Sequence, residues 1–135
     1  SRGLGDVYKR QVFLHLEDHD VFQREGDDLF CEIPVPFSTA ALGGELEVPT
    51  LTGRATIKVP PGTQGSTTFR LRDRGVTSLS SGRKGDLHVE VQVEVPTKLN
   101  REQKEKLLEF TESIGGRNSP MQEGFFEKAK RFFDL

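Results

Sequence analysis

The feature that most constrains the fold is the run DLHVEVQVEV, from Asp86 to Val95. Apolar side chains take every second position of this run, and polar side chains take the positions between them. Because successive side chains of a β-strand point to opposite faces, the pattern predicts a strand with one dry face and one solvated face. The dry face of this strand would consist of Leu87, Val89, Val91, Val93 and Val95.

The same two-residue period recurs at residues 29–37, 55–59 and 69–71. Glycine-bearing turns, PPGTQG and SSGRKG, separate these segments. Several short antiparallel strands with one wet face are typical of a β-sandwich or a curled sheet. We therefore expect a mainly β fold, a small two-layer β-sandwich.

Two features modify this β pattern. Proline cannot donate a hydrogen bond to a ladder, so Pro34 and Pro36 indicate an edge strand or positions that point outward from the sheet. The segment FSTAALGG, which ends at Gly44, begins like a turn of helix and breaks at its two glycines. The sequence therefore predicts one short helix between two strands.

The period changes from 2 to about 3.6 residues after Pro96, which predicts C-terminal α-helices. Asn100 is a suitable N-cap with Gln103 as its capping-box partner, and Gly115-Gly116 would end this helix. After the link GGRNS, Ser119-Pro120 with Gln122 predicts a second helix start. The apolar faces of the two helices would be Leu107, Phe110, Thr111 and Ile114, and Phe125, Phe126, Ala129, Phe132 and Phe133.

The phenylalanines of the second helix need a cover, because fully burying one such side chain stabilises by roughly 1.5–3 kcal/mol. Three surfaces could cover these phenylalanines: the core of the same chain, another subunit or a membrane surface. Balanced acidic and basic residues disfavour the membrane. The glycine-rich link favours a second subunit.

Composition excludes several classes of function. One cysteine, Cys31, and three scattered histidines (His15, His19 and His88) do not supply the four closely spaced ligands of a zinc site. No Ser-His-Asp arrangement, nucleophile elbow or phosphate-binding glycine motif is present, so no enzyme is expected. His88 would lie in solvent on the wet strand face.

The charge balance bears on partners and location. A formal net charge of −2 disfavours nucleic acid, although Arg70, Arg72 and Arg74 on one strand face, with Arg83-Lys84, would make either a solvated face or a patch for an acidic segment. No apolar run is long enough to span a membrane. A lone buried cysteine fits a reducing, cytoplasmic setting.

Ordered motifs from about Val12 to Leu135 carry a family resemblance. They are FQREGDDL, AALGGELEVPTLTG, VPPGTQ, FRLRDRGV, GRKGDLHVEVQVEVPTKL, LNREQKEKLLEF and FFEKAKRFFDL. Together they resemble the C-terminal region of a bacterial DnaJ-type J-domain co-chaperone. Residues 1–22 would be the remnant of a preceding β domain, with residues 1–11 a junction, a linker or non-native sequence. Residues 23–97 would be the second C-terminal β domain, and residues 98–135 a helical dimerisation segment.

The resemblance implies a homodimer that binds unfolded polypeptides and delivers them to a DnaK-type chaperone. It implies no cofactor in these residues, since the family's zinc is held by a cysteine-rich domain that this sequence lacks. The helix FSTAALGG would stand beside a sheet edge, at the place where client segments add as strands in the family's first β domain. The implied client contacts are Val35, Phe37, Ala41, Leu42, Leu46 and Val48. The implied dimer contacts are Leu107, Leu108, Phe110, Ile114, Phe125, Phe126, Phe132 and Phe133.

Three alternatives remain at this point. One is the C-terminal region of a curved-DNA-binding J protein, which the mild acidity disfavours. Another is an unrelated β-sandwich module that binds a peptide or a sugar, although the sugar version usually has exposed tryptophan and this chain has none. The third is an enzyme built on Cys31.

Overall fold

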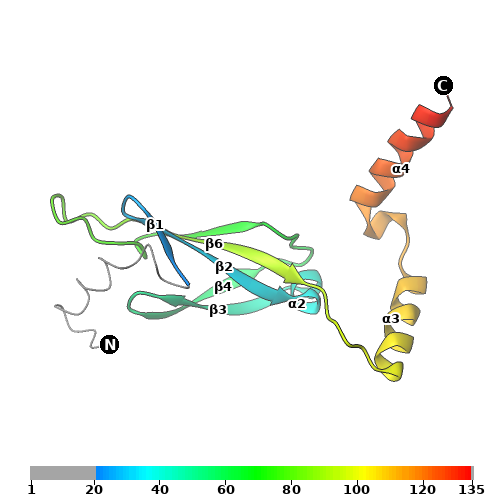
Figure 1. Ribbon diagram of the computed structural model, residues 1–135, viewed down its shortest axis with the longest axis horizontal. Coiled ribbons are helices and arrows are strands. Elements are labelled where there is room, and N and C mark those ends of the chain that lie inside the picture. Colours follow the sequence, from blue (N-terminus) through cyan, green and yellow to red (C-terminus); the bar gives the residue numbers. More distant parts are fainter. Residues whose placement is uncertain (1–20, 135) are drawn as a thin grey trace. The chain divides into compact units, whose positions relative to one another are not determined.

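The computed structural model describes residues 21–134, which belong to two compact units, one ending at Pro96 and the other starting at Thr97. The first unit consists of strands and one short helix, and the second consists of helices (Figure 1). The predicted class, a small two-layer β structure followed by helices, is confirmed. The strand predicted at residues 12–16 lies outside the described residues.

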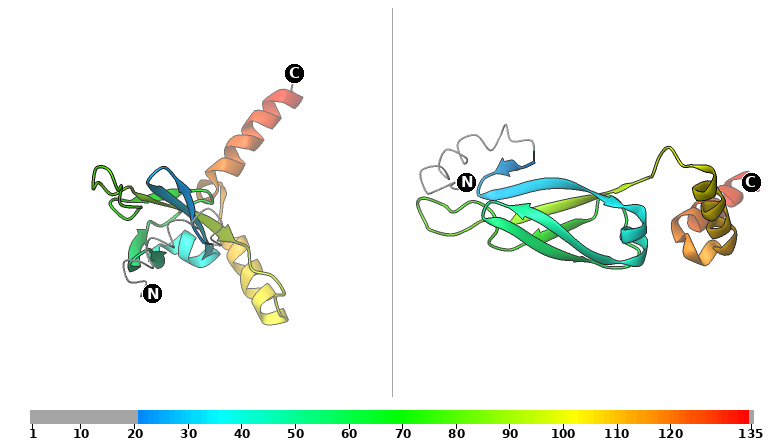
Figure 2. Two further views of the ribbon diagram at one scale, coloured as in Figure 1. Left: turned by 60° about the vertical axis from the view of Figure 1, so that its left-hand side comes forward. Right: turned by 90° about the horizontal axis from the view of Figure 1, so that it is seen from below.

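The β unit has two layers. A four-stranded sheet contains β1 (Gln23–Glu25), β2 (Asp28–Pro36), β5 (Thr68–Leu71) and β6 (Leu87–Glu94), in the spatial order β1-β2-β6-β5. The second layer is the antiparallel hairpin of β3 (Gly44–Thr50) and β4 (Gly53–Val59). The hairpin lies along one face of the larger sheet (Figure 2).

β2 and β6 pair in parallel, which corrects the prediction of antiparallel strands throughout. Their register aligns Leu29 with Leu87 and Val35 with Val93. β1 and β5 remain antiparallel to their neighbours. Parallel partners need a long crossover connection, and the chain between β2 and β6 supplies it with a helix, the hairpin and β5.

The dry faces of both layers enclose the core, which consists of a main cluster and a smaller cluster of Val35, Ala40 and Val91. The predicted inward positions of β6 are buried as far as Val91, and Val93 is half-buried. Val95 is an exception, because β6 ends at Glu94 and the side chain of Val95 is 74% exposed. The buried apolar residues of the main cluster are Phe22, Leu29, Cys31, Val48, Ile57, Val76, Leu87 and Val89.

The predicted short helix is α2 (Phe37–Leu42), which follows β2 directly. It ends at Gly43, whose N–H donates to the carbonyl oxygen of Thr39 at 2.8 Å. Gly43 has φ 82°, and a Cβ there would press on the ring of Pro61. Glycine is therefore required at this position on both conformational and steric grounds.

Two glycines bring a loop against the turn between β1 and β2. The N–H of Val76 donates to the carbonyl oxygen of Asp27 at 2.8 Å. Gly75 and Gly85 lie so near this carbonyl that a Cβ on either would overlap its oxygen. The motif glycines thus allow three backbone segments to pack without side chains between them.

Two aspartates satisfy the backbone beside this contact. Asp28 accepts from the backbone N–H of Asp86 at 2.8 Å and lies 3.0 Å from Nε2 of His88. Asp86 accepts from the backbone N–H of Asp73 at 3.0 Å and from Nε of Arg70 at 2.6 Å. The backbone hydrogen bond, then the side-chain partner, lower the pKa of each carboxyl below its usual 3.8.

The helical unit contains α3 (Arg101–Ser113), the 3₁₀ helix η2 (Gly116–Asn118) and α4 (Pro120–Phe133). The predicted capping box of α3 is confirmed, with Asn100 and Gln103 exchanging two 2.8 Å hydrogen bonds. α3 ends at Ser113 with Ile114 as its C-cap, so that Gly115 directly follows the cap and the predicted glycine stop is confirmed. The predicted start of α4 is confirmed, with Ser119 at the N-cap and Pro120 as the first helical residue, although the side chain of Ser119 makes no capping hydrogen bond.

The GGRNS link forms η2 where the sequence indicated irregular chain. The hydrogen bond from the N–H of Gly115 to Oδ1 of Asn118, at 3.0 Å, contributes to this turn. None of the helices described within residues 21–134 is long and apolar enough to cross a membrane.

Replacing Gly85 with alanine should lower the free energy of unfolding by about 2–3 kcal/mol, because the new methyl group would overlap the backbone carbonyl of Asp27. Urea denaturation measures the change. Gly44→Ala is the matched control, since its Cβ would meet only Thr39 Cγ2 at 3.6 Å, an ordinary contact. Equal stability of the two variants would contradict this account of the loop contact.

Acid should destabilise the β unit through Asp28 and Asp86. A carboxyl with a lowered folded-state pKa contributes stability above its unfolded value, about 3.9, and loses it as the pH falls through the folded value. Asp86→Asn should therefore be less stable than the parent at neutral pH, with the difference shrinking below about pH 4. Denaturation at several pH values tests this. Glu47→Gln, which removes an exposed partner of Arg54, should show no comparable pH dependence.

Candidate functional site

The predicted client contacts divide into a buried set and an exposed set. Val35 and Val48 are each 1% exposed and belong to the core. Leu46 is half-buried and packs against both core clusters. Val35 and Leu46 pack in the cluster beneath α2, whereas Val48 belongs to the main core cluster. A ligand at the surface would not reach Val35 or Val48.

The exposed set lies on α2. Phe37 is 43% exposed and Leu42 is 77% exposed, with Ala41 also exposed between them in the sequence. Phe37 therefore does not continue the inward alternation of β2, because the chain has already turned into helix at this residue. The surface of α2 offers apolar side chains on a short rigid element.

α2 is anchored by its opposite face. Ala40 is buried against Val35 and Val91. The loop after β4 attaches from the other side, where the N–H groups of Gly62 and Thr63 donate to the carbonyl oxygen of Ala40, both at 2.9 Å. The helix is thereby fixed to the end of β2 while Ala41 and Leu42 stay accessible.

The outer edge of β2 lies beside this helix. β1 pairs with β2 only through residues 28–30, where Gln23 is opposite Phe30. Further along β2, Pro34 and Pro36 are exposed. β2 is not an edge strand, because it lies between β1 and β6. The other predicted alternative holds, since no strand described within residues 21–134 pairs with β2 at Pro34 and Pro36 on the side of β1.

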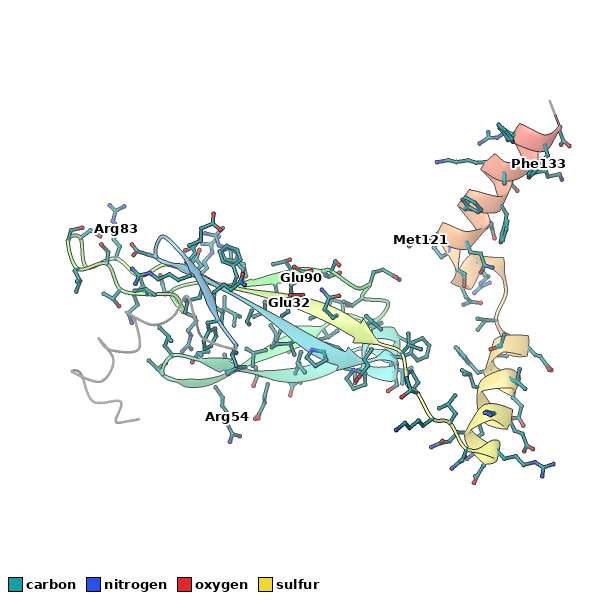
Figure 3. The ribbon with its side chains drawn as sticks, in the orientation of Figure 1. Glu32, Arg54, Arg83, Glu90, Met121 and Phe133 are labelled. Atoms are coloured by element: carbon teal, nitrogen blue, oxygen red, sulfur yellow. The ribbon has the colours of Figure 1, made fainter. Side chains whose placement is uncertain are left out.

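The outer face of the four-stranded sheet carries a polar groove of about 690 Å³. Glu32 and Glu90 are directly opposite each other on β2 and β6, and both project from this face (Figure 3). Nε2 of Gln92 donates to both carboxylates, at 3.2 and 2.8 Å. Like charges in this position repel, and the shared amide partly offsets that repulsion.

His88 lies on the predicted face but is not freely solvated. Its ring stacks on Phe30 with centroids 4.5 Å apart, and its Nε2 lies 3.0 Å from Asp28. The side chain is only 21% exposed. The alternation in the sequence placed His88 on the correct strand face. It could not reveal that His88 stacks on Phe30, which lies on β2.

The predicted arginine face is only partly formed. β5 ends at Leu71, so Arg72 and Arg74 lie beyond the strand and do not extend one strand face with Arg70. The guanidinium of Arg70 is paired with Asp86. The idea of three arginines aligned for an acidic segment is therefore wrong.

Neither a metal centre nor a reactive thiol is evident in the described part of the chain. Within residues 21–134, no group of three or more His, Cys, Asp or Glu side chains could hold a metal ion. Cys31 is 5% exposed, and burial raises the pKa of its thiol. A buried neutral thiol is a poor nucleophile, which argues against chemistry at Cys31.

The predicted dimer contacts are accessible within the helical unit. Leu107, Leu108 and Phe110 of α3 are exposed, and Ile114 is half-buried. The four phenylalanines of α4 are 57–80% exposed. The predicted residues on α4 are Phe125, Phe126, Phe132 and Phe133, the last of which stands in its final turn (Figure 3).

These phenylalanines share one side of α4. At 100° per residue, they and Ala129 fall within about a third of the helix circumference. Adjacent rings meet edge to face, with centroids 5.6 Å apart for Phe125 and Phe126 and 5.5 Å apart for Phe132 and Phe133. The last turn of α3, η2 and α4 also border a groove of about 520 Å³, whose lining includes Ile114 and Phe126.

Both units match known protein families. Residues 3–96 match the family described as DnaJ C terminal domain, and residues 102–134 match the family described as chaperone protein DnaJ C-terminal region. The chain is 52% identical over 129 residues to a protein of Opitutus terrae named chaperone protein DnaJ. That match covers 96% of the chain and 33% of the relative, so the chain spans about a third of the relative's length. The predicted chaperone family, as opposed to an enzyme, is confirmed: this chain belongs to the DnaJ C-terminal domain family.

Proposed function

We propose that this chain is the client-binding and dimerisation region of a DnaJ-like co-chaperone, which holds unfolded polypeptides and delivers them to a DnaK-type chaperone. The observation that carries the proposal is the match of both units, in chain order, to DnaJ C-terminal families. Residues 23–97 would be the second C-terminal β domain, and residues 98–135 the dimerisation segment. Residues 1–22 would be the end of a preceding β domain.

The client surface in this proposal is α2. Leu42 and Ala41 present accessible apolar surface, and Ala40 fixes the helix beneath them. An unfolded polypeptide exposes apolar side chains that gain free energy when such a surface covers them. Leu46 would support the site from below, while Val35 and Val48 would act only through the core.

The remaining parts of the activity lie with other segments of the family's proteins. Contact with the ATPase of a DnaK-type partner would require a J domain, and zinc would be held by a cysteine-rich domain. The described residues offer no comparable metal ligands. A cytoplasmic location fits the buried free thiol of Cys31.

The phenylalanine face of α4 supports dimerisation. Exposing four large aromatic side chains on one side of a helix to water is unfavourable. The same face of a second copy of the chain would cover them. Dimerisation would place two client surfaces on one polypeptide substrate. Two weak sites on one molecule then act with a high effective concentration, which raises overall affinity.

Leu42→Asp should weaken client binding about tenfold, since the interaction loses the burial of one leucine side chain. Fluorescence anisotropy with labelled, reduced and alkylated lactalbumin as the unfolded client measures the affinity. Leu79→Asp, at a loop residue that is 94% exposed in the same unit, is the matched control and should bind normally. Equal losses in both variants would show that α2 is not the client surface.

Phe132→Glu should convert a dimer into a monomer, because a charge would be buried in the proposed interface. Sedimentation equilibrium of the full chain measures its mass. Arg131→Glu introduces the same side chain on the opposite side of α4 and should leave the dimer intact. If the Phe132→Glu variant is still a dimer, this helix face is not part of the interface.

A further inference from the structure

We infer that α4 pairs with α4 of a second copy in the antiparallel direction, with the two-fold axis at Ala129, so that each Ala129 faces the other. This inference rests on the proposed dimerisation and specifies the register and the direction of the two helices. Its basis is the order of the phenylalanines along α4, the charges at the two ends of the helix and the groove at its start.

The phenylalanines of α4 are arranged symmetrically about Ala129. Phe125 and Phe126 lie four and three residues before Ala129, and Phe132 and Phe133 lie three and four residues after it. At 100° per residue, the two rings of each pair fall on either side of Ala129, at about 40° and 60° from it. An interface with two-fold symmetry uses the same patch of both copies, so the patch must be self-complementary. The arrangement of the rings meets this requirement with Ala129 at its centre.

The small side chain of Ala129 allows two helices to approach at this centre. Packed helices lie about 8–10 Å apart, and the Cα atoms lie about 2.3 Å from each helix axis, so facing Cα atoms would be roughly 4–5 Å apart. A large side chain would not fit between them. Away from this point, Phe125 and Phe126 of one copy would meet Phe132 and Phe133 of the other.

The charges of α4 favour the antiparallel direction. Glu123 lies in the first turn of the helix, and Lys130 and Arg131 lie in its last turn. An antiparallel partner brings the acidic start of one helix beside the basic end of the other, and it opposes the two helix dipoles. A parallel partner would instead place like charges and like helix ends together.

The start of α4 offers room for the end of the second helix. The groove of about 520 Å³ at the end of α3, η2 and α4 is lined by Ile114, Gln122 and Phe126. Phe133 stands in the last turn of α4 (Figure 3). In the antiparallel register, Phe133 of the second copy would lie beside Phe126, at the mouth of this groove.

The patch is large enough for a specific pair. A phenylalanine buries about 150–250 Å², so four rings that are 57–80% exposed offer roughly 500 Å² per copy. Two copies would together bury about 1,000 Å², which reaches the area expected of a specific interface.

Cysteine cross-linking of the full chain tests the register, with the disulfide-linked dimer measured by non-reducing electrophoresis. Ala129→Cys should form an intermolecular disulfide under mild oxidation, because facing Cα atoms roughly 4–5 Å apart suit disulfide geometry. Gln122→Cys lies on the same side of α4 and should not cross-link, because antiparallel counterparts there would be about 20 Å apart. In a parallel pair both variants would cross-link. The parent chain, whose Cys31 is buried, is the blank.

A second experiment tests whether residue 129 faces its own counterpart. Ala129→Glu and Ala129→Lys should each raise the dissociation constant of the dimer about tenfold or more, because like charges would face each other. An equal mixture of the two variants should recover the dimer in sedimentation equilibrium, because unlike charges then meet. Arg131→Glu, on the opposite side of α4, is the control and should leave the dimer intact. Without recovery in the mixture, the placement of the axis at Ala129 is wrong.

The outcomes separate the register from the dimer itself. A parent chain that is a monomer would overturn the proposed dimerisation and this inference with it. A dimer in which Gln122→Cys cross-links would keep the dimerisation and overturn the antiparallel direction. A dimer in which Ala129→Cys does not cross-link would keep the dimerisation and overturn the register. Cross-linking by Ala129→Cys alone, with recovery of the dimer in the mixture, would support both.

Discussion

The parallel pairing of β2 with β6 is the constraint on which the rest of the β unit depends. These two strands occupy the centre of the larger sheet and supply Leu29, Leu87 and Val89, all 0% exposed, to the core. Parallel neighbours end at the same end of the sheet, so the chain must return along the sheet before β6 begins. α2 and the β3–β4 hairpin lie in that return path, and the hairpin covers the apolar face that the central pair creates.

At the start of both strands, close backbone packing takes the place of side-chain packing. Gly75 and Gly85 let a loop reach the carbonyl of Asp27, and Asp28 and Asp86 accept the backbone N–H groups that this approach brings near them. The motifs GDDL, RDRG and GRKGDL therefore meet in space for a structural reason. The carboxylates of Asp28 and Asp86 bind the protein's own backbone, so these two acidic residues have a structural role. Among residues 21–134, no cluster of side chains could hold a metal ion.

Much of this organisation could be predicted from the sequence, because burial imposes a period that single residues reveal. Alternation identified β2, β4, β5 and β6, and the capping residues located the start of α3. Strand direction could not be predicted, since an alternating strand looks the same beside a parallel or an antiparallel partner. The stacking of His88 on Phe30 was also missed, because it joins residues of two strands whose register was unknown.

The candidate site likewise combines features that the sequence could predict with features that it could not. The sequence correctly placed apolar residues around FSTAALGG, but it could not separate the buried Val35 and Val48 from the exposed Leu42, because that depends on how α2 rotates against the sheet. Ala40 fixes the rotation, as its small side chain lets the helix approach Val35 and Val91 closely. Once Ala40 packs against Val35 and Val91, the side chains on the opposite side of α2 are the ones that stay exposed.

The proposed client surface of the β unit has to stay exposed without causing the protein to associate through it. Large contiguous apolar patches and open strand edges are the two surfaces that most often cause such association. In the β unit the six-residue helix α2 carries two of the exposed large apolar side chains, Phe37 and Leu42, and the other exposed ones, Val21, Leu79 and Val95, lie outside this helix. The strand edge beside the helix carries two prolines where N–H donors would otherwise be. A helix face cannot template a ladder, whereas an open edge would recruit another copy of the same edge as readily as a client.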